Sequence, residues 1–205
     1  MMSVVAADQP TAPECLELRS PLLESSVEAF ADDQRHVIVD LGVVRSGTVA
    51  LFGQFRARLD VAGLEVGRGQ GIESLEPDDF GRLVRSALPP ADHEPVDMIL
   101  CWNLFNYLST DQIGIVVTEL ARRCRPGARL HALIEYSART MPAHPQSFSP
   151  VSSGLLVADV VSGPQVAAPR YGPRDLEKCM PGFAHERTML LGNGMQEYLF
   201  RHSAA

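Results

Sequence analysis

The sequence predicts an α/β fold in which a mostly parallel sheet, layered between helices, ends in an antiparallel hairpin. Three observations lead to this prediction. Short apolar, β-branched runs alternate with segments whose apolar residues recur at helical spacing. The first of these runs ends in a glycine turn that leads into a helical segment. Near the C-terminus, Gly192-Asn-Gly194 separates two strand-like runs, and Asn-Gly in that position is a strong hairpin signal.

The first half of the chain predicts two strands and three helices. Ser20-Pro21 is typical of a helix start, because proline suits the first helical position. Residues 36–42 are nearly all apolar, as in a strand buried on both faces. A helix over 48–55 and a weaker strand over 58–62 follow. Another helix begins at Pro77, with acidic residues in its first turn, and ends at Pro89-Pro90.

The second half predicts the rest of the sheet. A strong strand covers 96–102, and the spacing of Ser109 and Gln112 predicts a capping box at the start of the next helix. Pro126-Gly127 is expected to end that helix before a strand over 130–136. A short helix over 173–180 precedes the hairpin runs 186–191 and 195–201. Residues 137–170, rich in Ser, Pro and Ala, are predicted to form an insertion over one edge of the sheet.

Length and composition predict one cytoplasmic domain over residues 15–205, after a disordered N-terminal tail of residues 1–14. The net charge of −7 disfavours binding to nucleic acid. The N-terminus lacks the pattern of a signal peptide, and the longest apolar run, about 98–105, is too short to span a membrane. The four cysteines form no CxxC pair and the six histidines have no metal-ligand spacing, so no metal site is expected.

Four segments carry a resemblance to a known family. They are Val-Ile-Val-Asp-Leu-Gly at 37–42, Asp-Met-Ile-Leu-Cys-Trp-Asn at 97–103, Cys-Arg-Pro-Gly-Ala-Arg-Leu at 124–130, and the helix and Pro-Gly-Phe turn at 171–183. Over about residues 30–202 the chain resembles class I S-adenosylmethionine-dependent methyltransferases, whose seven-stranded sheet ends in a reversed hairpin strand. The resemblance implies S-adenosylmethionine as the cofactor if the protein is active.

The glycine motif departs from the family pattern. The family reads Asp-x-Gly-x-Gly-x-Gly, whereas this chain, counted from Asp40, has Gly42 followed by Val44 and Ser46. The middle glycine normally lets the backbone approach the ligand closely, and a branched valine obstructs that approach. Gly47 falls one position late and could restore part of the turn.

The acidic residue that binds the ribose in the family is also displaced. The corresponding position at the end of the second strand is Gly63, which cannot accept those hydrogen bonds. Glu65 lies two residues further on and could substitute if the loop bends, whereas Asp60 lies within the strand. Several lost hydrogen bonds to a charged group, at about 1.5–3 kcal/mol each, would weaken cofactor binding strongly.

Carried over position by position, the resemblance gives a candidate cofactor-binding set and no catalytic residue. The set is Asp40, Gly42, Gly47, Glu65, Trp102 and Asn103. Packing is the favoured role for Trp102. Asn103 and Asn106 could face a substrate or cap turns, and the turn role is favoured. Glu135 could act as a general base, although a solvated carboxylate is the simpler interpretation.

Other functional classes match the same residues less well. Gly42 and Gly47 have the spacing of a phosphate loop, but Thr48 stands where its lysine belongs. A dinucleotide fingerprint would lack its middle glycine, and no GxSxG hydrolase motif occurs. We therefore expect a non-catalytic binding or regulatory module that docks a protein partner or a second copy of itself. The alternative is an atypical methyltransferase acting on a small molecule or a protein.

Overall fold

The computed structural model describes residues 15–30, 33–64 and 75–203. Their main feature is a six-stranded sheet of order β10-β11-β5-β4-β2-β3. Strands β3, β2, β4 and β5 are parallel to one another, and β11 runs antiparallel to both β5 and β10. The strands are β2 (His36–Asp40), β3 (Ala57–Val61), β4 (Val96–Trp102), β5 (Cys124–Glu135), β10 (Phe183–Leu190) and β11 (Met195–His202). The predicted α/β fold with its C-terminal antiparallel hairpin is confirmed.

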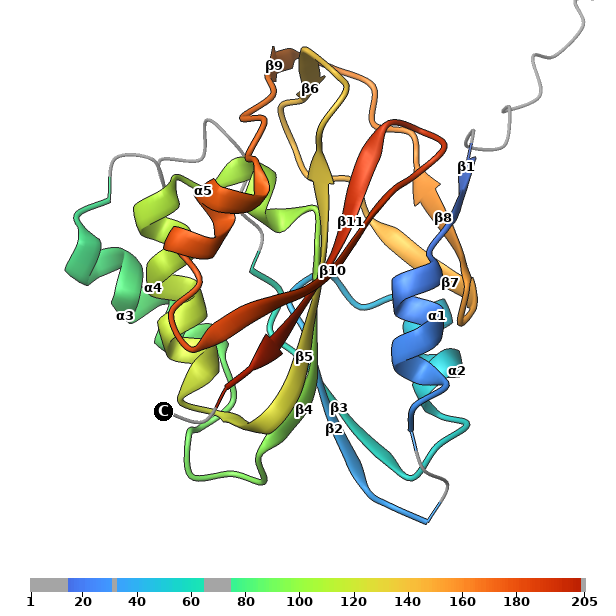
Figure 1. Ribbon diagram of the computed structural model, residues 1–205, viewed down its shortest axis with the longest axis vertical. Coiled ribbons are helices and arrows are strands. Elements are labelled where there is room, and N and C mark those ends of the chain that lie inside the picture. Colours follow the sequence, from blue (N-terminus) through green and yellow to red (C-terminus); the bar gives the residue numbers. More distant parts are fainter. Residues whose placement is uncertain (1–14, 31–32, 65–74, 204–205) are drawn as a thin grey trace, which may run out of the picture.

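Helices cover both faces of the sheet, which gives three layers (Figure 1). On one face lie α1 (Pro21–Val27) and α2 (Ser46–Phe52); on the other lie α3 (Pro77–Ala87), α4 (Thr110–Ala121) and α5 (Pro173–Lys178). Each face of the sheet has its own hydrophobic core, and strand β2 contributes side chains to both, because successive side chains of a strand point to opposite faces. Val37 and Val39 pack in the core with Phe80 of α3, whereas Ile38 packs with Phe52 of α2. This two-sided burial explains why the β2 sequence is almost entirely apolar.

Several predicted boundaries shift. Helix α4 ends at Ala121, and β5 begins at Cys124, so that Pro126 and Gly127 lie inside the strand rather than ending the helix. Gly127 has φ +84°, a conformation that glycine adopts without strain. The capping box is confirmed: Ser109 Oγ accepts from the Gln112 amide at 3.2 Å, and Gln112 Oε1 accepts from the Ser109 amide at 3.0 Å.

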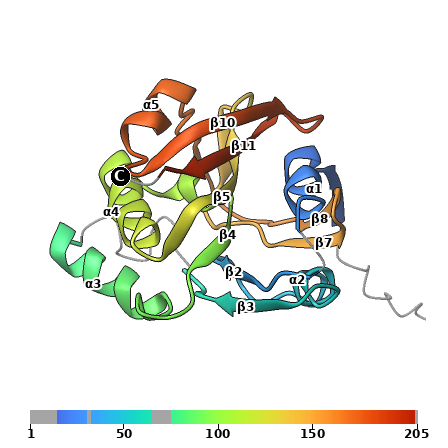
Figure 2. The same cartoon turned by 60° about the horizontal axis from the view of Figure 1, so that its bottom comes forward.

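The insertion contributes strands to two small sheets. Strand β6 (Thr140–Pro142) pairs with β9 (Gln165–Ala167), while β7 (Phe148–Ser152) and β8 (Leu155–Asp159) form a sheet with β1 (Cys15–Arg19), for which the sequence had predicted no strand. Figure 2 shows β7 and β8 beside α1 and α2. Within the insertion, β7 packs on α2, one of the helices that cover the main sheet.

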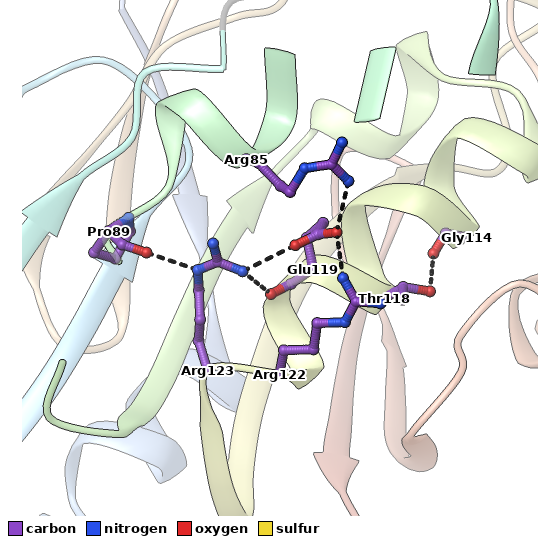
Figure 3. A network of polar contacts seen from close by, with 7 residues as sticks. All are labelled: Arg85, Pro89, Gly114, Thr118, Glu119, Arg122 and Arg123. Carbon is purple, nitrogen blue, oxygen red and sulfur yellow. Dashed lines mark hydrogen bonds and ion pairs between the residues drawn. The ribbon is translucent and has the colours of Figure 1, made fainter. Parts of the chain in front are cut away.

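Helices α3 and α4 are joined by an ionic network around Glu119, whose side chain is 5% exposed (Figure 3). The carboxylate accepts from Arg122 Nη1 at 2.7 Å, from Arg123 Nη1 at 3.1 Å and from Arg85 Nη1 at 3.2 Å. Burial alone would raise the Glu119 pKa, but the hydrogen bonds from Arg123 and Arg85, together with the charges of Arg122 and Arg123, outweigh it and hold the pKa below its usual value. Among the helices described, none is long and apolar enough to cross a membrane.

Candidate ligand site

A cavity of about 240 Å³ lies where the carboxyl ends of β2, β3 and β4 meet the insertion. In open α/β sheets, ligands bind in the crevice at this end of the strands. The sheet contributes residues 41–43, Leu64 and 101–104, and the insertion contributes residues 144–148. The insertion therefore forms one wall of the crevice, which the sequence did not predict. One feature of the sequence could have indicated that this segment packs against the crevice: Phe148 is the single Phe, Tyr or Trp in residues 137–170.

The side chains of Asp40 and Trp102 are hydrogen-bonded to each other at the floor of the crevice. Asp40 is 1% exposed, and its Oδ1 accepts from Trp102 Nε1 at 2.7 Å and from the Gly42 amide at 2.8 Å. Its Oδ2 is buried with no hydrogen-bond partner in the described residues. Burial raises the Asp40 pKa to about 6, although the hydrogen bonds from Gly42 and Trp102 oppose the shift. The sequence placed Asp40 correctly at the turn, where it bonds to a loop amide.

Trp102 takes an unusual backbone conformation at the end of β4. Its φ is +47°, a region that bulky residues rarely enter. The indole lies over Gly42, where an added Cβ would be 2.8 Å from Trp102 Cδ1. The indole also stacks with Phe148 of the insertion, with ring centroids 5.9 Å apart and planes 13° apart. Trp102 thus packs between the glycine turn and the insertion.

Gly47, the second residue of α2, is covered by strand β7. An added Cβ at Gly47 would overlap the Pro150 carbonyl oxygen and Ser149 Oγ. An ion pair between Arg45, which precedes α2, and Asp159 of β8 joins the same two segments. Gly47 is therefore needed for the close approach of the insertion to the helix.

The two asparagines after β4 differ in their partners. Asn106 is fully buried; its Nδ2 donates to the carbonyls of Asn103 and Leu133, and its Oδ1 accepts from the Glu135 amide at 2.9 Å. These bonds give Asn106 the structural role favoured from the sequence. Asn103 is only 4% exposed and lines the cavity, yet no described residue hydrogen-bonds its side-chain amide.

Gly63, Glu65 and Glu135 are the remaining candidates. Gly63, at the position of the family's acidic residue, has φ +54° and nothing within 4 Å of an added Cβ. Glu65 lies outside the described residues. Glu135 is half-buried, and burial raises its pKa, but it does not line the cavity. The cavity therefore brings together Gly42, Trp102 and Asn103 of the predicted set, with Asp40 bonded beneath.

A second polar cluster, Ser20, His131 and Glu197, has the residue types of a hydrolase triad without its geometry. Ser20 Oγ and Glu197 Oε1 both meet the same imidazole nitrogen, Nε2 of His131, at 3.4 and 2.8 Å. A catalytic histidine instead bridges its partners through different nitrogens. All three residues are fully buried, and Glu197 also accepts from the amides of Leu22 and Leu23. The cluster therefore anchors α1 to the sheet.

Other features of the described chain offer less chemistry. A larger hollow of about 1,000 Å³ lies between α3, α4 and α5, and its lining mixes acidic and basic side chains. No three His, Cys, Asp or Glu residues gather as a metal site within 15–30, 33–64 and 75–203. Cys101 and Cys179 are buried and Cys124 is half-buried. The strand-end cavity remains the best-defined candidate.

Comparison with solved structures gives the same fold. The chain is 13% identical to the 1,6-didemethyltoxoflavin-N1-methyltransferase of Burkholderia thailandensis with bound S-adenosylhomocysteine, covering 90% of this chain and 76% of that one at a TM-score of 0.50. It is 16% identical to a putative type 11 methyltransferase of Sulfolobus solfataricus, covering 92% and 95% at a TM-score of 0.52. No protein-family model and no curated protein matches the sequence. The chain therefore has the fold of class I S-adenosylmethionine-dependent methyltransferases.

Proposed function

We propose that this protein is a cytoplasmic, non-catalytic binding or regulatory module built on a methyltransferase fold. The observation that carries the proposal is that the protein's own atoms fill the space over Gly42 of the β2–α2 turn and over Gly47 at the start of α2. Trp102 lies against Gly42, and the β7 backbone lies against Gly47. In a cofactor-binding turn, this space is where the ligand approaches the backbone.

The remaining crevice suits S-adenosylmethionine poorly in size. Its volume of about 240 Å³ is below the roughly 300–1,000 Å³ of pockets for drug-sized ligands. Three contacts hold the insertion that narrows it: the Trp102–Phe148 stack, the packing of β7 on Gly47, and the Arg45–Asp159 ion pair. These contacts oppose the displacement of the insertion that a larger ligand would require.

The chemistry of the crevice also fits the cofactor poorly. S-adenosylmethionine carries a sulfonium, an ammonium and a carboxylate, and each buried charge needs a partner. Among the described residues that line the cavity there is no Asp, Glu, Lys or Arg. Asp40 lies beneath: its Oδ1 is bonded to the indole and to the Gly42 amide, and only its Oδ2 lacks a partner among the described residues, so one carboxylate would have to serve both cationic groups. The described residues therefore fit the cofactor poorly, and we derive no methyl-transfer step.

Calorimetric titration of the folded protein with S-adenosylmethionine and S-adenosylhomocysteine tests this proposal. We expect no heat of binding up to millimolar ligand. A micromolar dissociation constant for either compound would overturn the proposal and favour an atypical methyltransferase acting on a small molecule or a protein.

If the cofactor does not bind, the module's role depends on a partner protein or on a second copy of the chain. Light scattering over a range of protein concentrations separates these two cases. A dimer mass that persists on dilution supports self-association, and a monomer mass throughout supports a different partner.

A further inference from the structure

We propose that the strand-end cavity binds a small, neutral, planar heteroaromatic molecule with an amide-like edge, of the oxopurine or pyridine-carboxamide class. The inference rests on the proposed function, since it requires that S-adenosylmethionine does not occupy the crevice. Size is the first argument. A volume of about 240 Å³, below that of pockets for drug-sized ligands, favours a molecule of one or two rings.

Charge is the second argument. The side chains that line the cavity are apolar, aromatic or uncharged polar, apart from His144, which is exposed at its rim. Recognition of a phosphate or carboxylate usually involves Arg or Lys, and a buried cation needs an acid. Neither kind of residue lines the cavity within the described part of the chain. A neutral ligand is the class that can enter without leaving a charge unpaired.

The third argument is the shape of the walls. Trp102 and Phe148 both line the cavity, and their rings lie within 13° of parallel. Leu41, Leu64 and Leu104 add apolar surface. The two rings stack on each other, and together with the leucines they give the cavity a largely apolar wall, which suits the hydrophobic surface of a ring.

The fourth argument, and the most specific, is the Asn103 side chain. The residue is 4% exposed, yet its amide has no hydrogen-bond partner in the described residues. Neither amide atom is among the sealed, unpartnered side-chain atoms of the described residues, and the residue lines the cavity. A carboxamide presents one donor and one acceptor side by side, and asparagine reads a matching pair on a heterocycle edge in this way. A ligand with such an edge would satisfy a polar group that the protein leaves unpaired.

The test uses the indole signal of Trp102 as the reporter. Because the chain has one tryptophan, its indole N–H gives a single cross-peak in a ¹H–¹⁵N spectrum. The full-length protein is titrated with hypoxanthine and with nicotinamide, which are neutral and carry an amide edge, and with benzoate, which is planar but charged. We expect the peak to move to saturation with at least one of the first two, with a dissociation constant below about 1 mM, and not with benzoate.

Variants then assign the contact. Asn103→Leu keeps the side-chain size and should weaken binding by about tenfold or more, because a bidentate pair contributes about 1–3 kcal/mol of discrimination. Asn103→Ala provides the same test if the leucine variant does not fold. Asn193→Ala, in the exposed β10–β11 turn, is the matched control and should bind as the wild type does.

Each outcome distinguishes the two proposals. No shift with hypoxanthine or nicotinamide, equal binding of benzoate, or unchanged affinity of the Asn103 variants would overturn the ligand proposal while leaving the non-catalytic module intact. Micromolar binding of S-adenosylmethionine in the calorimetric test would overturn the proposed function itself.

Discussion

The indole Nε1 of Trp102 donates a hydrogen bond to Asp40 Oδ1 at 2.7 Å, and this bond joins the carboxyl ends of two adjacent parallel strands. A strand end that usually faces a ligand is here closed by a side chain from the neighbouring strand. The same indole stacks with Phe148, so the bond also sets the position of the insertion wall.

Replacing Trp102 should show that its backbone is strained. Because φ is +47°, Trp102→Gly should be more stable than Trp102→Ala by about 1 kcal/mol, although both lose the indole. Urea unfolding followed by circular dichroism measures the difference, since both variants lack the only tryptophan. The matched pair is Val61→Ala and Val61→Gly on edge strand β3, where alanine should be the more stable. If the alanine variant were more stable than the glycine variant at position 102 as well as at position 61, the backbone of Trp102 would not be strained.

Adding a methyl group at Gly47 should disrupt the contact between α2 and β7. Gly47→Ala should destabilise the protein by about 1–3 kcal/mol, because the opposing atoms include the Pro150 backbone oxygen, which cannot rotate away. This loss should exceed the helix-propensity gain of about 1 kcal/mol from replacing glycine with alanine. Gly192→Ala, with nothing within 4 Å of the added Cβ, is the control and should leave the unfolding midpoint within error. Equal unfolding midpoints for the two variants would mean that β7 does not contact Gly47 closely.

Asp40 should make stability depend on pH. Its pKa is about 6 in the folded protein against an ordinary value of 3.8, so the folded state binds the proton more tightly than the unfolded state. The stability of the wild type relative to Asp40→Asn should therefore be greatest below pH 4, fall by about 2–3 kcal/mol as the pH rises to about 6, and then stay constant.

The difference between the two proteins is measured by urea unfolding from pH 4 to 8. Taking this difference removes the contributions of Glu119, Glu135 and Glu197, whose shifted pKa values are common to both. A difference that does not change with pH would exclude a raised Asp40 pKa.

The Glu119 network should depend unequally on its arginines. Arg123 has a side chain 8% exposed and also donates to the Pro89 carbonyl at 2.7 Å, whereas the Arg122 side chain is 60% exposed. Arg123→Gln should destabilise the protein by about 2–3 kcal/mol, and Arg122→Gln by less than about 1 kcal/mol. Chemical denaturation at neutral pH compares the two variants. Similar losses would show that burial does not govern the strength of these pairs.

The order of elements was determined by the sequence itself. Strand β2 is apolar at successive positions because both of its faces are buried, and the Ser109–Gln112 capping box and the Asn-Gly hairpin are local patterns that read the same in any context. Such signals depend on neighbours within a few residues. They were enough to predict the fold and to place Asp40 and Gly42 at the turn.

What fills the crevice was decided by tertiary structure alone. Trp102 and Phe148 are 46 positions apart in the chain, and Gly47 and Pro150 are 103 apart, so no local pattern could show that these residues meet. The pairing of β1 with β8 is of the same kind, since a short strand is defined by a distant partner. From the sequence, Gly42 and Gly47 were expected to leave room for a cofactor. In the structure, Gly42 packs against the Trp102 side chain and Gly47 against the β7 backbone. Long-range packing determines which atoms occupy the space above a turn.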